Sequence, residues 1–256
     1  MTDKALKIEN VKKCFGATAA VDTINLEVEK GTIFGILGPN GAGKTTTIRM
    51  MAGLLKPDCG RILIGGKDIV KNSRRAKRKF ALIPDVPYIY KKVTGWEFMK
   101  FIAAIYDMDS ENIDEEIDKQ LKVFSVDNVA CDLVESYSHG LRQRLLLASV
   151  MMRDPEIIIL DEPMVGLDPE AARMVKDIFF KLRNEKSRTI FLSTHTLTDA
   201  HELCDRIAII TKGQIIAEGT FEELKAVADK ISRQAGLSTA GAASLEEVYL
   251  QITRNT

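Results

Sequence analysis

The sequence predicts an α/β fold in which a mainly parallel sheet carries an antiparallel β lobe and an inserted α-helical lobe. Four mainly apolar runs are centred on Phe34, Ile158, Phe191 and Ile209. Such runs are typical of strands that are covered on both faces in a parallel sheet. The first run continues through a glycine-rich segment into a helical pattern, which is the order of a strand–loop–helix unit.

Two lobes are expected beside this core. Residues 1 to about 30 alternate apolar and polar side chains, and the run 61–64 is followed by a Gly-Gly turn. Both patterns predict antiparallel strands. Residues of about 88–153 follow helical patterns and are acidic in the middle, so they predict the helical lobe.

Length and composition fit a single domain of two lobes. The chain has 256 residues, of which 45% are hydrophobic, and this is ample for a two-lobed domain with its own core. We expect one main domain at 1–219 and a short C-terminal extension at 220–256. The extension contains a small-residue linker at 236–241.

The most informative stretch fits the phosphate-binding pattern G-x-x-x-x-G-K-[ST]. Residues 32–37 before it read as a buried strand, and residues 45–52 after it as a helix, which is the context that the pattern requires. Glycines let successive backbone N–H groups point at phosphate oxygens. A turn that merely caps a helix is the alternative, and this context disfavours it. The expected nucleotide-binding residues are Gly38, Pro39, Asn40, Gly41, Ala42, Gly43, Lys44, Thr45 and Thr46.

Three side chains of this loop have distinct expected roles. Lys44 reaches the β- and γ-phosphates, and the hydroxyl of Thr45 is placed to bind Mg²⁺. Thr46 is positioned for a phosphate nearer the sugar. The positive end of the helix dipole adds to the attraction for anions.

A pair of acids follows the apolar run 156–160. The carboxyl ends of parallel strands are where ligands of α/β sheets bind. Asp161 is therefore expected to hold Mg²⁺, and Glu162 to orient and deprotonate the water that attacks the γ-phosphate. The alternative, that the two acids only cap the next turn, becomes weak once Lys44 is considered with them.

Residues 137–144 read Y-S-H-G-L-R-Q-R and resemble a variant of the L-S-G-G-Q signature of ATP-binding cassette (ABC) ATPases. The resemblance covers nearly the whole chain. It implies a P-loop NTPase (RecA-like) core, with ATP as the nucleotide and Mg²⁺ as the metal. It is closest to the exporter-type (ABC-2-like) subfamily, whose membrane subunits are separate chains.

Further positions follow the family's order. Gly166-Leu167-Asp168 resembles the D-loop, and His195 resembles the switch histidine that contacts the γ-phosphate and holds Glu162 and Asp168 in register. Phe15 resembles the aromatic residue that stacks on adenine, although a lone aromatic residue is also common in a core. Acidic, His and Cys residues at 199–204 resemble a metal cluster, but their helical pattern favours an ordinary helix.

The signature residues Ser138, His139 and Gly140 imply a dimer in which each subunit closes over the ATP of the other, with Ser138 as a helix N-cap. The second subunit is either an identical chain or a different ABC ATPase. Two departures from the family affect hydrolysis. Asp85 replaces the usual Q-loop glutamine, with a predicted contact to Mg²⁺ through water, and His139 and Leu141 replace a glycine and a glutamine of the signature.

Charge and hydropathy limit the kinds of partner that the chain is expected to bind. The 36 basic and 36 acidic residues cancel, so no nucleic acid is expected, and the basic run 71–79 is interpreted as a solvated helix face rather than a lipid or RNA site. The four cysteines lack metal or redox spacing and are expected to be reduced. No apolar run approaches the ~20 residues that span a bilayer.

The resemblance implies an ATPase subunit that drives transport through a separate polytopic membrane subunit. With no apolar run long enough to span a bilayer, we expect the chain to be cytoplasmic and peripheral on the inner face of the cell membrane. Residues 87–90 and 93–96 offer docking contacts, although Trp96 fits a buried position equally well. The alternative is a soluble regulatory or nucleic-acid-associated clamp. A GTPase is disfavoured because the sequence lacks an N-K-x-D guanine motif.

Overall fold

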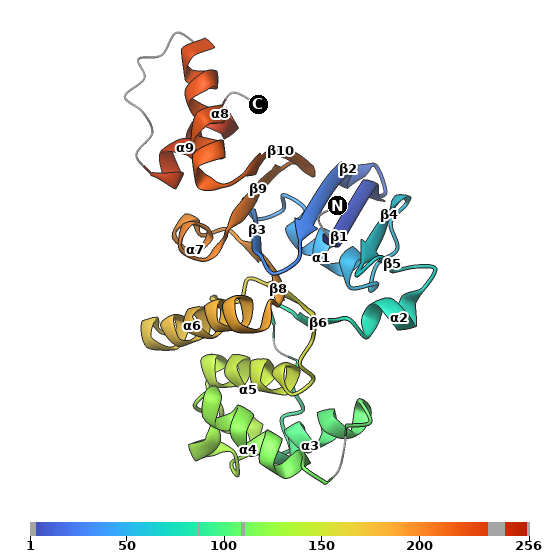
Figure 1. Ribbon diagram of the computed structural model, residues 1–256, viewed down its shortest axis with the longest axis vertical. Coiled ribbons are helices and arrows are strands. Elements are labelled where there is room, and N and C mark those ends of the chain that lie inside the picture. The colour runs from blue at the N-terminus through green and yellow to red at the C-terminus, as the bar shows by residue number, and fades with distance from the viewer. Residues whose placement is uncertain (1–3, 87, 109–110, 235–243, 255–256) are drawn as a thin grey trace.

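The computed structural model describes residues 4–86, 88–108, 111–234 and 244–254. Its two sheets and surrounding helices confirm the predicted fold class. The helical lobe and the C-terminal helices lie at opposite ends of the molecule, with both sheets between them (Figure 1).

The larger sheet has six strands in the order β10-β9-β3-β8-β7-β6. Neighbours from β9 to β6 are parallel, whereas β10 at the edge runs antiparallel to β9. The four predicted core strands are confirmed, and β6 and β10 are additional. The bounds are β3 Ile33–Leu37, β6 Phe80–Ile83, β7 Ile157–Asp161, β8 Thr189–Thr194, β9 Arg206–Thr211 and β10 Gln214–Gly219.

The smaller sheet is antiparallel, as expected from the alternating N-terminal pattern. Its order is β2-β1-β4-β5, and the turn at Gly65-Gly66 joins β4 to β5. The bounds are β1 Lys4–Phe15, β2 Thr18–Glu29, β4 Cys59–Ile64 and β5 Lys67–Asp68.

The helices belong to three groups: those around the larger sheet, those of the helical lobe, and those of the C-terminal extension. Helix α3 begins with a full capping box, in which Thr94 and Glu97 bond each other's backbone N–H groups. The bounds are α1 Lys44–Met51, α2 Ser73–Lys77, α3 Gly95–Ile105, α4 Ile113–Val123, α5 His139–Met151, α6 Pro169–Lys186, α7 Leu197–Leu203, α8 Phe221–Gln234 and α9 Leu245–Arg254. Two short 3₁₀ helices span Asp127–Val129 and Val134–Ser136.

Alternate residues of the central strands are buried on opposite faces of the larger sheet. Phe34 and Phe191 stack with ring centroids 5.8 Å apart and share a core with α1 and the antiparallel sheet. Ile158 and Ile190 point into a second core with the helical lobe and α6. Burial on both faces explains why these strands are apolar throughout.

Two interpretations of exposed segments are resolved by burial. Trp96 is half-buried and packs against the core of the helical lobe, which supports the buried alternative. In α2, Arg74, Arg75 and Lys77 are exposed while Ala76 is buried, as in a solvated helix face. The predicted linker at 236–241 lies outside the described residues.

The C-terminal helices share a core with strands of the larger sheet. Leu224 of α8 and Val248 of α9 are fully buried against Leu37 and Ile209 of the central strands. Leu37 is the last residue of β3, directly before the glycine-rich loop. Helices α8 and α9 pack on each other and against β10 at the sheet edge, and they share this core with the end of β3.

Truncation of Leu224 to alanine is expected to lower the free energy of unfolding by about 2–4 kcal/mol, because the lost side chain leaves a cavity among packed neighbours. Val227 on the same helix is 39% exposed, so Val227→Ala is the matched control, with an expected change below about 0.5 kcal/mol. Urea unfolding of the two variants measures the difference. Equal effects would show that α8 does not pack as described.

Candidate functional site

The glycine-rich loop joins β3 to α1 and is held tightly against neighbouring strands. A Cβ atom at Gly38 would lie 2.3 Å from the carbonyl oxygen of Ile210, and one at Gly43 would lie 2.5 Å from that of Ala20. Gly43 also has a φ of 108°, in the region that favours glycine. Backbone packing therefore requires glycine at both positions. The loop leads into the start of α1, where backbone N–H groups of a helix N-terminus can bind an anion.

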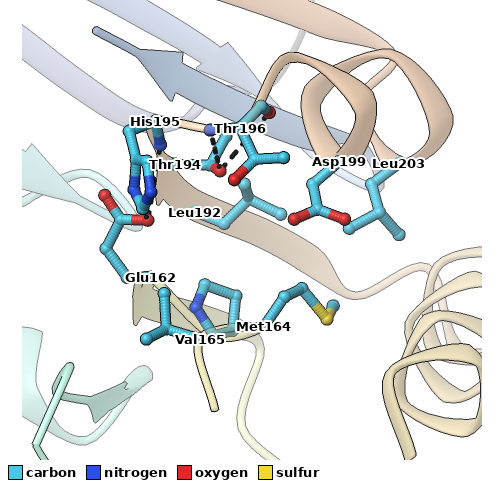
Figure 2. A pocket seen from close by; sticks show the side chains of 10 residues that line it. Glu162, Met164, Val165, Leu192, Thr194, His195, Thr196, Asp199 and Leu203 are labelled. Carbon is cyan, nitrogen blue, oxygen red and sulfur yellow. Dashed lines mark hydrogen bonds and ion pairs between the residues drawn. The ribbon is translucent and has the colours of Figure 1, made fainter. Parts of the chain in front are cut away.

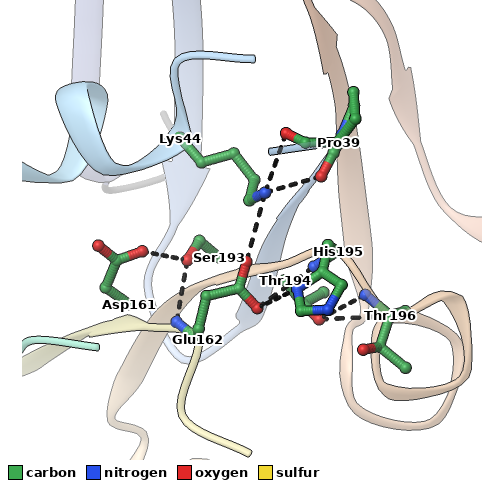
Figure 3. A network of polar contacts seen from close by, with 9 residues as sticks. Pro39, Lys44, Asp161, Glu162, Ser193, Thr194, His195 and Thr196 are labelled. Atoms are coloured by element: carbon green, nitrogen blue, oxygen red, sulfur yellow. Dashed lines mark hydrogen bonds and ion pairs between the residues drawn. The ribbon is translucent and has the colours of Figure 1, made fainter. Parts of the chain in front are cut away.

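Lys44 lies under this loop and is 5% exposed. Its ammonium donates hydrogen bonds to the carbonyl oxygens of Gly38 at 2.7 Å and Pro39 at 3.2 Å. It also lies 3.3 Å from Oε1 of Glu162. Figure 3 shows these contacts converging on one nitrogen. A buried cation that faces the glycine-rich loop is suited to an anionic ligand such as a phosphate chain.

Glu162 links the lysine to His195. Its Oε2 is 2.9 Å from Nδ1 of His195 and accepts a hydrogen bond from the His195 backbone N–H at 3.3 Å. The three side chains expected to be catalytic, Lys44, Glu162 and His195, are thus brought into one contiguous network (Figure 3). They come from the start of α1 and from the carboxyl ends of β7 and β8, the sheet edge predicted for ligand binding.

Asp161 precedes Glu162 and is buried at the end of β7. It is 2% exposed, and its Oδ1 accepts a 2.5 Å hydrogen bond from the Ser193 hydroxyl. Burial raises the pKa of this carboxyl, while hydrogen bonds from Ser193 and Thr45 act in the lowering direction. Thr45 thus lies beside Asp161, and their hydroxyl and carboxylate are the hard oxygen donors that Mg²⁺ prefers. The donor set fits the expected metal.

Asp85 follows β6 on an exposed loop. Its carboxylate accepts a hydrogen bond from the backbone N–H of Val86 at 2.9 Å. Its charge also contributes to the raised pKa of Asp161, so the loop lies on the same side of the sheet as the acids. Its predicted contact to Mg²⁺ through water remains a prediction.

A cavity of about 100 Å³ lies beside the Glu162–His195 pair. Figure 2 shows Met164 and Val165 on one side of it and Thr194, Thr196 and Asp199 on the other. The cavity separates the turn after β7 from the turn after β8. It leaves space next to the carboxylate for small polar molecules.

The signature residues begin α5. The Ser138 hydroxyl accepts a hydrogen bond from the backbone N–H of Leu141 at 3.2 Å, which confirms the predicted N-cap. The imidazole of His139 lies against Gly166, where an added Cβ would be 2.5 Å from its Nδ1. Asp168 accepts a hydrogen bond from Ala171 N–H at 2.8 Å and caps α6.

The signature and the catalytic network form separate groups within the chain. Among the described residues, no hydrogen bond or ion pair joins Ser138, His139 or Gly140 to Lys44, Glu162 or His195. The predicted link between His195 and Asp168 is likewise not among the hydrogen bonds of the described residues.

Phe15 lies at the end of β1 and is 54% exposed, so the alternative that it is a core residue is wrong. Its ring is 5.8 Å from the ammonium of Lys13. An exposed ring face at this position is available to stack on a planar group.

The acidic, His and Cys residues of α7 have other partners. Asp199 and Glu202 both contact Lys176, at 2.8 and 2.7 Å. His201 packs edge-on against Phe221 with centroids 4.7 Å apart, and burial raises the pKa of the Cys204 thiol. These contacts agree with the ordinary helix that the pattern predicted.

Sequence reasoning missed Ser193. Its position opposite Asp161 in the register of β7 and β8 follows from the strand order, and no motif in the sequence reveals it.

The chain matches known proteins over most of its length. The family model described as ABC transporter matches residues 21–165. The bacitracin transport ATP-binding protein BcrA of Bacillus licheniformis is 37% identical over 86% of this chain and 71% of its own length. The daunorubicin resistance ATP-binding protein DrrA3 of Streptomyces coeruleorubidus is 34% identical over 96% of this chain and 79% of its own.

A solved structure agrees with the fold. The chain titled as the ATP binding subunit of an ABC transporter superposes with a TM-score of 0.83 and 29% identity, over 97% of this chain and 99% of that one. In the part of the chain that the structure describes, no helix combines the length and apolar character needed to cross a membrane. The family match, the relatives and the shared fold show that this chain belongs to the ABC transporter family, as an ATP-binding subunit with ATPase activity.

Proposed function

We propose that this ATPase powers export through a separate polytopic membrane subunit and works as a dimer on the cytoplasmic face of the cell membrane. As a member of the ABC transporter family the chain binds ATP with Mg²⁺ and hydrolyses ATP. Export is supported by the names of relatives, which include bacitracin transport and daunorubicin resistance proteins. The dimer is either symmetric or formed with a different ABC ATPase.

The observation that carries the dimer is the separation of two half-sites. The Lys44–Glu162–His195 network holds one set of phosphate-binding groups, whereas the capped start of α5 at Ser138 offers another. A helix N-terminus with free N–H groups attracts phosphate oxygens. Two copies related by a twofold axis place each Ser138 over the network of the other copy.

Within each site, each residue of the chain has its own role in binding or hydrolysing ATP. Lys44 binds the β- and γ-phosphates, Phe15 stacks on adenine, and Thr45 and Asp161 hold Mg²⁺, with Asp85 acting through water. Mg²⁺ neutralises phosphate charge when it is bound. Glu162 accepts a proton from the attacking water, and His195 holds the Glu162 carboxylate in place.

The ion pair between Lys44 and Glu162 suggests the order in which these residues act: Lys44 binds phosphate first, and Glu162 then acts on the water. At 3.3 Å, the ammonium and the carboxylate neutralise each other before ATP arrives. The γ-phosphate competes with the carboxylate for Lys44, because both are anions that need the same ammonium. Glu162 is then left with His195 at 2.9 Å and becomes available to the water.

A surface hollow between the central sheet and the helical lobe is the proposed docking surface for the membrane subunit. Its volume is about 280 Å³, and it is lined by residues that include Leu54, Leu82, Ile102 and Tyr106. Leu54 is 66% exposed and Tyr106 is 48% exposed. Adjacent apolar groups at a surface are typical of protein contacts. Tyr88 and Tyr90 on the Asp85 loop are also exposed.

Affinity purification tests the proposal. A tagged Glu162→Gln variant is trapped with ATP and recovered from detergent-solubilised native membranes, and a polytopic membrane protein is expected to co-purify. Recovery only with ribosomes, DNA or soluble proteins would reject the transporter assignment and favour a regulatory clamp.

A second substitution locates the contact. Leu54→Asp in the Glu162→Gln background is expected to release the membrane protein, since a charge cannot be buried without a partner. Val227→Asp on α8, at the other end of the molecule from α3 (Figure 1), is the control and is expected to retain it. Retention by both variants would place the docking surface elsewhere.

A further inference from the structure

Ser193 is a buried hydroxyl at the junction of the two acids. It lies near the end of β8, where it pairs in register with Asp161 of β7, and its exposed fraction is 0%. Its Oγ donates to Oδ1 of Asp161 at 2.5 Å and accepts from the backbone N–H of Glu162 at 3.0 Å. Figure 3 shows the hydroxyl between the two residues. One side chain thus contacts both the expected metal ligand and the backbone of the expected base.

The backbone of Glu162 needs such support. Its φ is 51°, in the left-handed region that residues other than glycine rarely adopt, at a cost of about 1–3 kcal/mol. The bond from its N–H to Ser193 fixes the peptide at the start of this turn. The bonds from its carboxylate to Lys44 and His195 fix the side chain. The hydrogen bond to Ser193 therefore orients the backbone of Glu162 independently of any ligand that its side chain contacts.

The carboxylate of Asp161 depends on the same hydroxyl. At 2% exposure it has little access to water, and a buried carboxylate that loses a donor carries a large desolvation cost. The hydrogen bond occupies Oδ1 and fixes the plane of the carboxyl group. A fixed plane leaves the remaining oxygen lone pairs directed at one position, as in metal sites whose ligands are oriented by outer hydrogen bonds.

We propose that Ser193 is a positioning residue for ATP hydrolysis, which orients Asp161 toward Mg²⁺ and Glu162 toward the attacking water through one shared hydroxyl. Ser193 contacts neither Lys44 nor the phosphate-binding loop among the described hydrogen bonds. Its removal therefore acts on the metal and on the base and leaves the lysine contacts with phosphate intact. The inference rests on the roles proposed above for Asp161 and Glu162.

The test is Ser193→Ala, compared with Thr189→Val on the same strand. Thr189 is 2% exposed, and its hydroxyl accepts from Gly31 N–H at 3.0 Å. The control therefore also removes a buried hydroxyl of β8 that accepts from a backbone N–H, at the opposite end from the acids. Turnover at saturating Mg²⁺, the Mg²⁺ concentration at half-maximal activity, and ATP affinity in EDTA are measured for each variant.

For Ser193→Ala, turnover is expected to fall or the half-saturating Mg²⁺ concentration to rise by about 10- to 100-fold, as for other residues that orient metal ligands. ATP affinity in EDTA is expected to stay within about twofold, since the lysine contacts are intact. The Thr189→Val control is expected to change none of the three values by more than about twofold. Equal losses in the two variants, or a parallel loss of ATP affinity without Mg²⁺, would overturn the inference.

An Asp161→Asn variant separates failure of this inference from failure of the proposed site. If Asp161→Asn abolishes Mg²⁺-dependent turnover while Ser193→Ala behaves as wild type, only the role of Ser193 is wrong. If neither variant affects the Mg²⁺ dependence, the metal site itself is wrong and the inference falls with it.

Discussion

Lys44→Ala is expected to reduce ATP hydrolysis by at least about 10²–10³-fold, the cost of deleting one preorganised charge from a water-poor site. The ammonium is 5% exposed and contacts two loop carbonyls and Glu162. No other ammonium is described within this network, so no neighbour replaces the lost charge. Steady-state phosphate release at saturating ATP, together with binding of a fluorescent ATP analogue, measures the effect.

The matched control for this variant is Lys79→Ala. Lys79 bonds Glu156 at 2.7 Å, and both lie at the amino ends of β6 and β7, opposite to the catalytic edge. The control also breaks a lysine–glutamate ion pair beside the same sheet, but an exposed one, and is expected to change hydrolysis by less than about twofold. Activity above about a tenth of wild type in Lys44→Ala would contradict the phosphate-binding role of this residue.

Glu162→Gln is expected to slow hydrolysis by about 10²–10⁴-fold, the usual contribution of a general base, and to accumulate an ATP-bound dimer. The amide keeps the shape of the side chain but cannot accept the proton of water. Lys44 keeps its bonds to Gly38 and Pro39, so the loop remains ready for phosphate. Single-turnover hydrolysis and light scattering with and without ATP measure the two effects.

Glu156→Gln is the corresponding control because it makes the same change just before the other end of β7, at an exposed site. It is expected to hydrolyse ATP at the wild-type rate and to form no long-lived dimer. If Glu162→Gln hydrolysed ATP within about threefold of wild type, another group would have to be the base. If hydrolysis fell with no dimer at any ATP concentration, the proposed dimer would be wrong.

Local sequence patterns were sufficient to predict the elements that hold the proposed site. The apolar runs around Phe34 and Ile158 became central strands, and Ser138 became the cap of α5. These features depend on burial periodicity, on glycine geometry and on a side chain that bonds a backbone N–H three residues away. All of these are properties of short segments.

Two strands of the larger sheet were not predicted, for identifiable reasons. β6 has only four residues, Phe80–Ile83, all of them apolar, and so short an apolar run does not distinguish a strand from a buried helix segment. β10, Gln214–Gly219, mixes exposed and half-buried residues because it lies at the sheet edge. Both strands are defined by their pairing with a neighbour, and the segments alone do not reveal that pairing.

The sequence by itself determined the glycine-rich loop, the two acids and their order along the chain, because each rests on residues that are close in sequence. Only the tertiary structure decided that Lys44 meets Glu162, that His139 packs on Gly166, and that Ser193 joins both acids. The hydroxyl and Asp161 are 32 residues apart, and they meet because β7 and β8 pair in parallel with this register. Strand order and register are set by packing of the whole core, so contacts between strands depend on the complete fold.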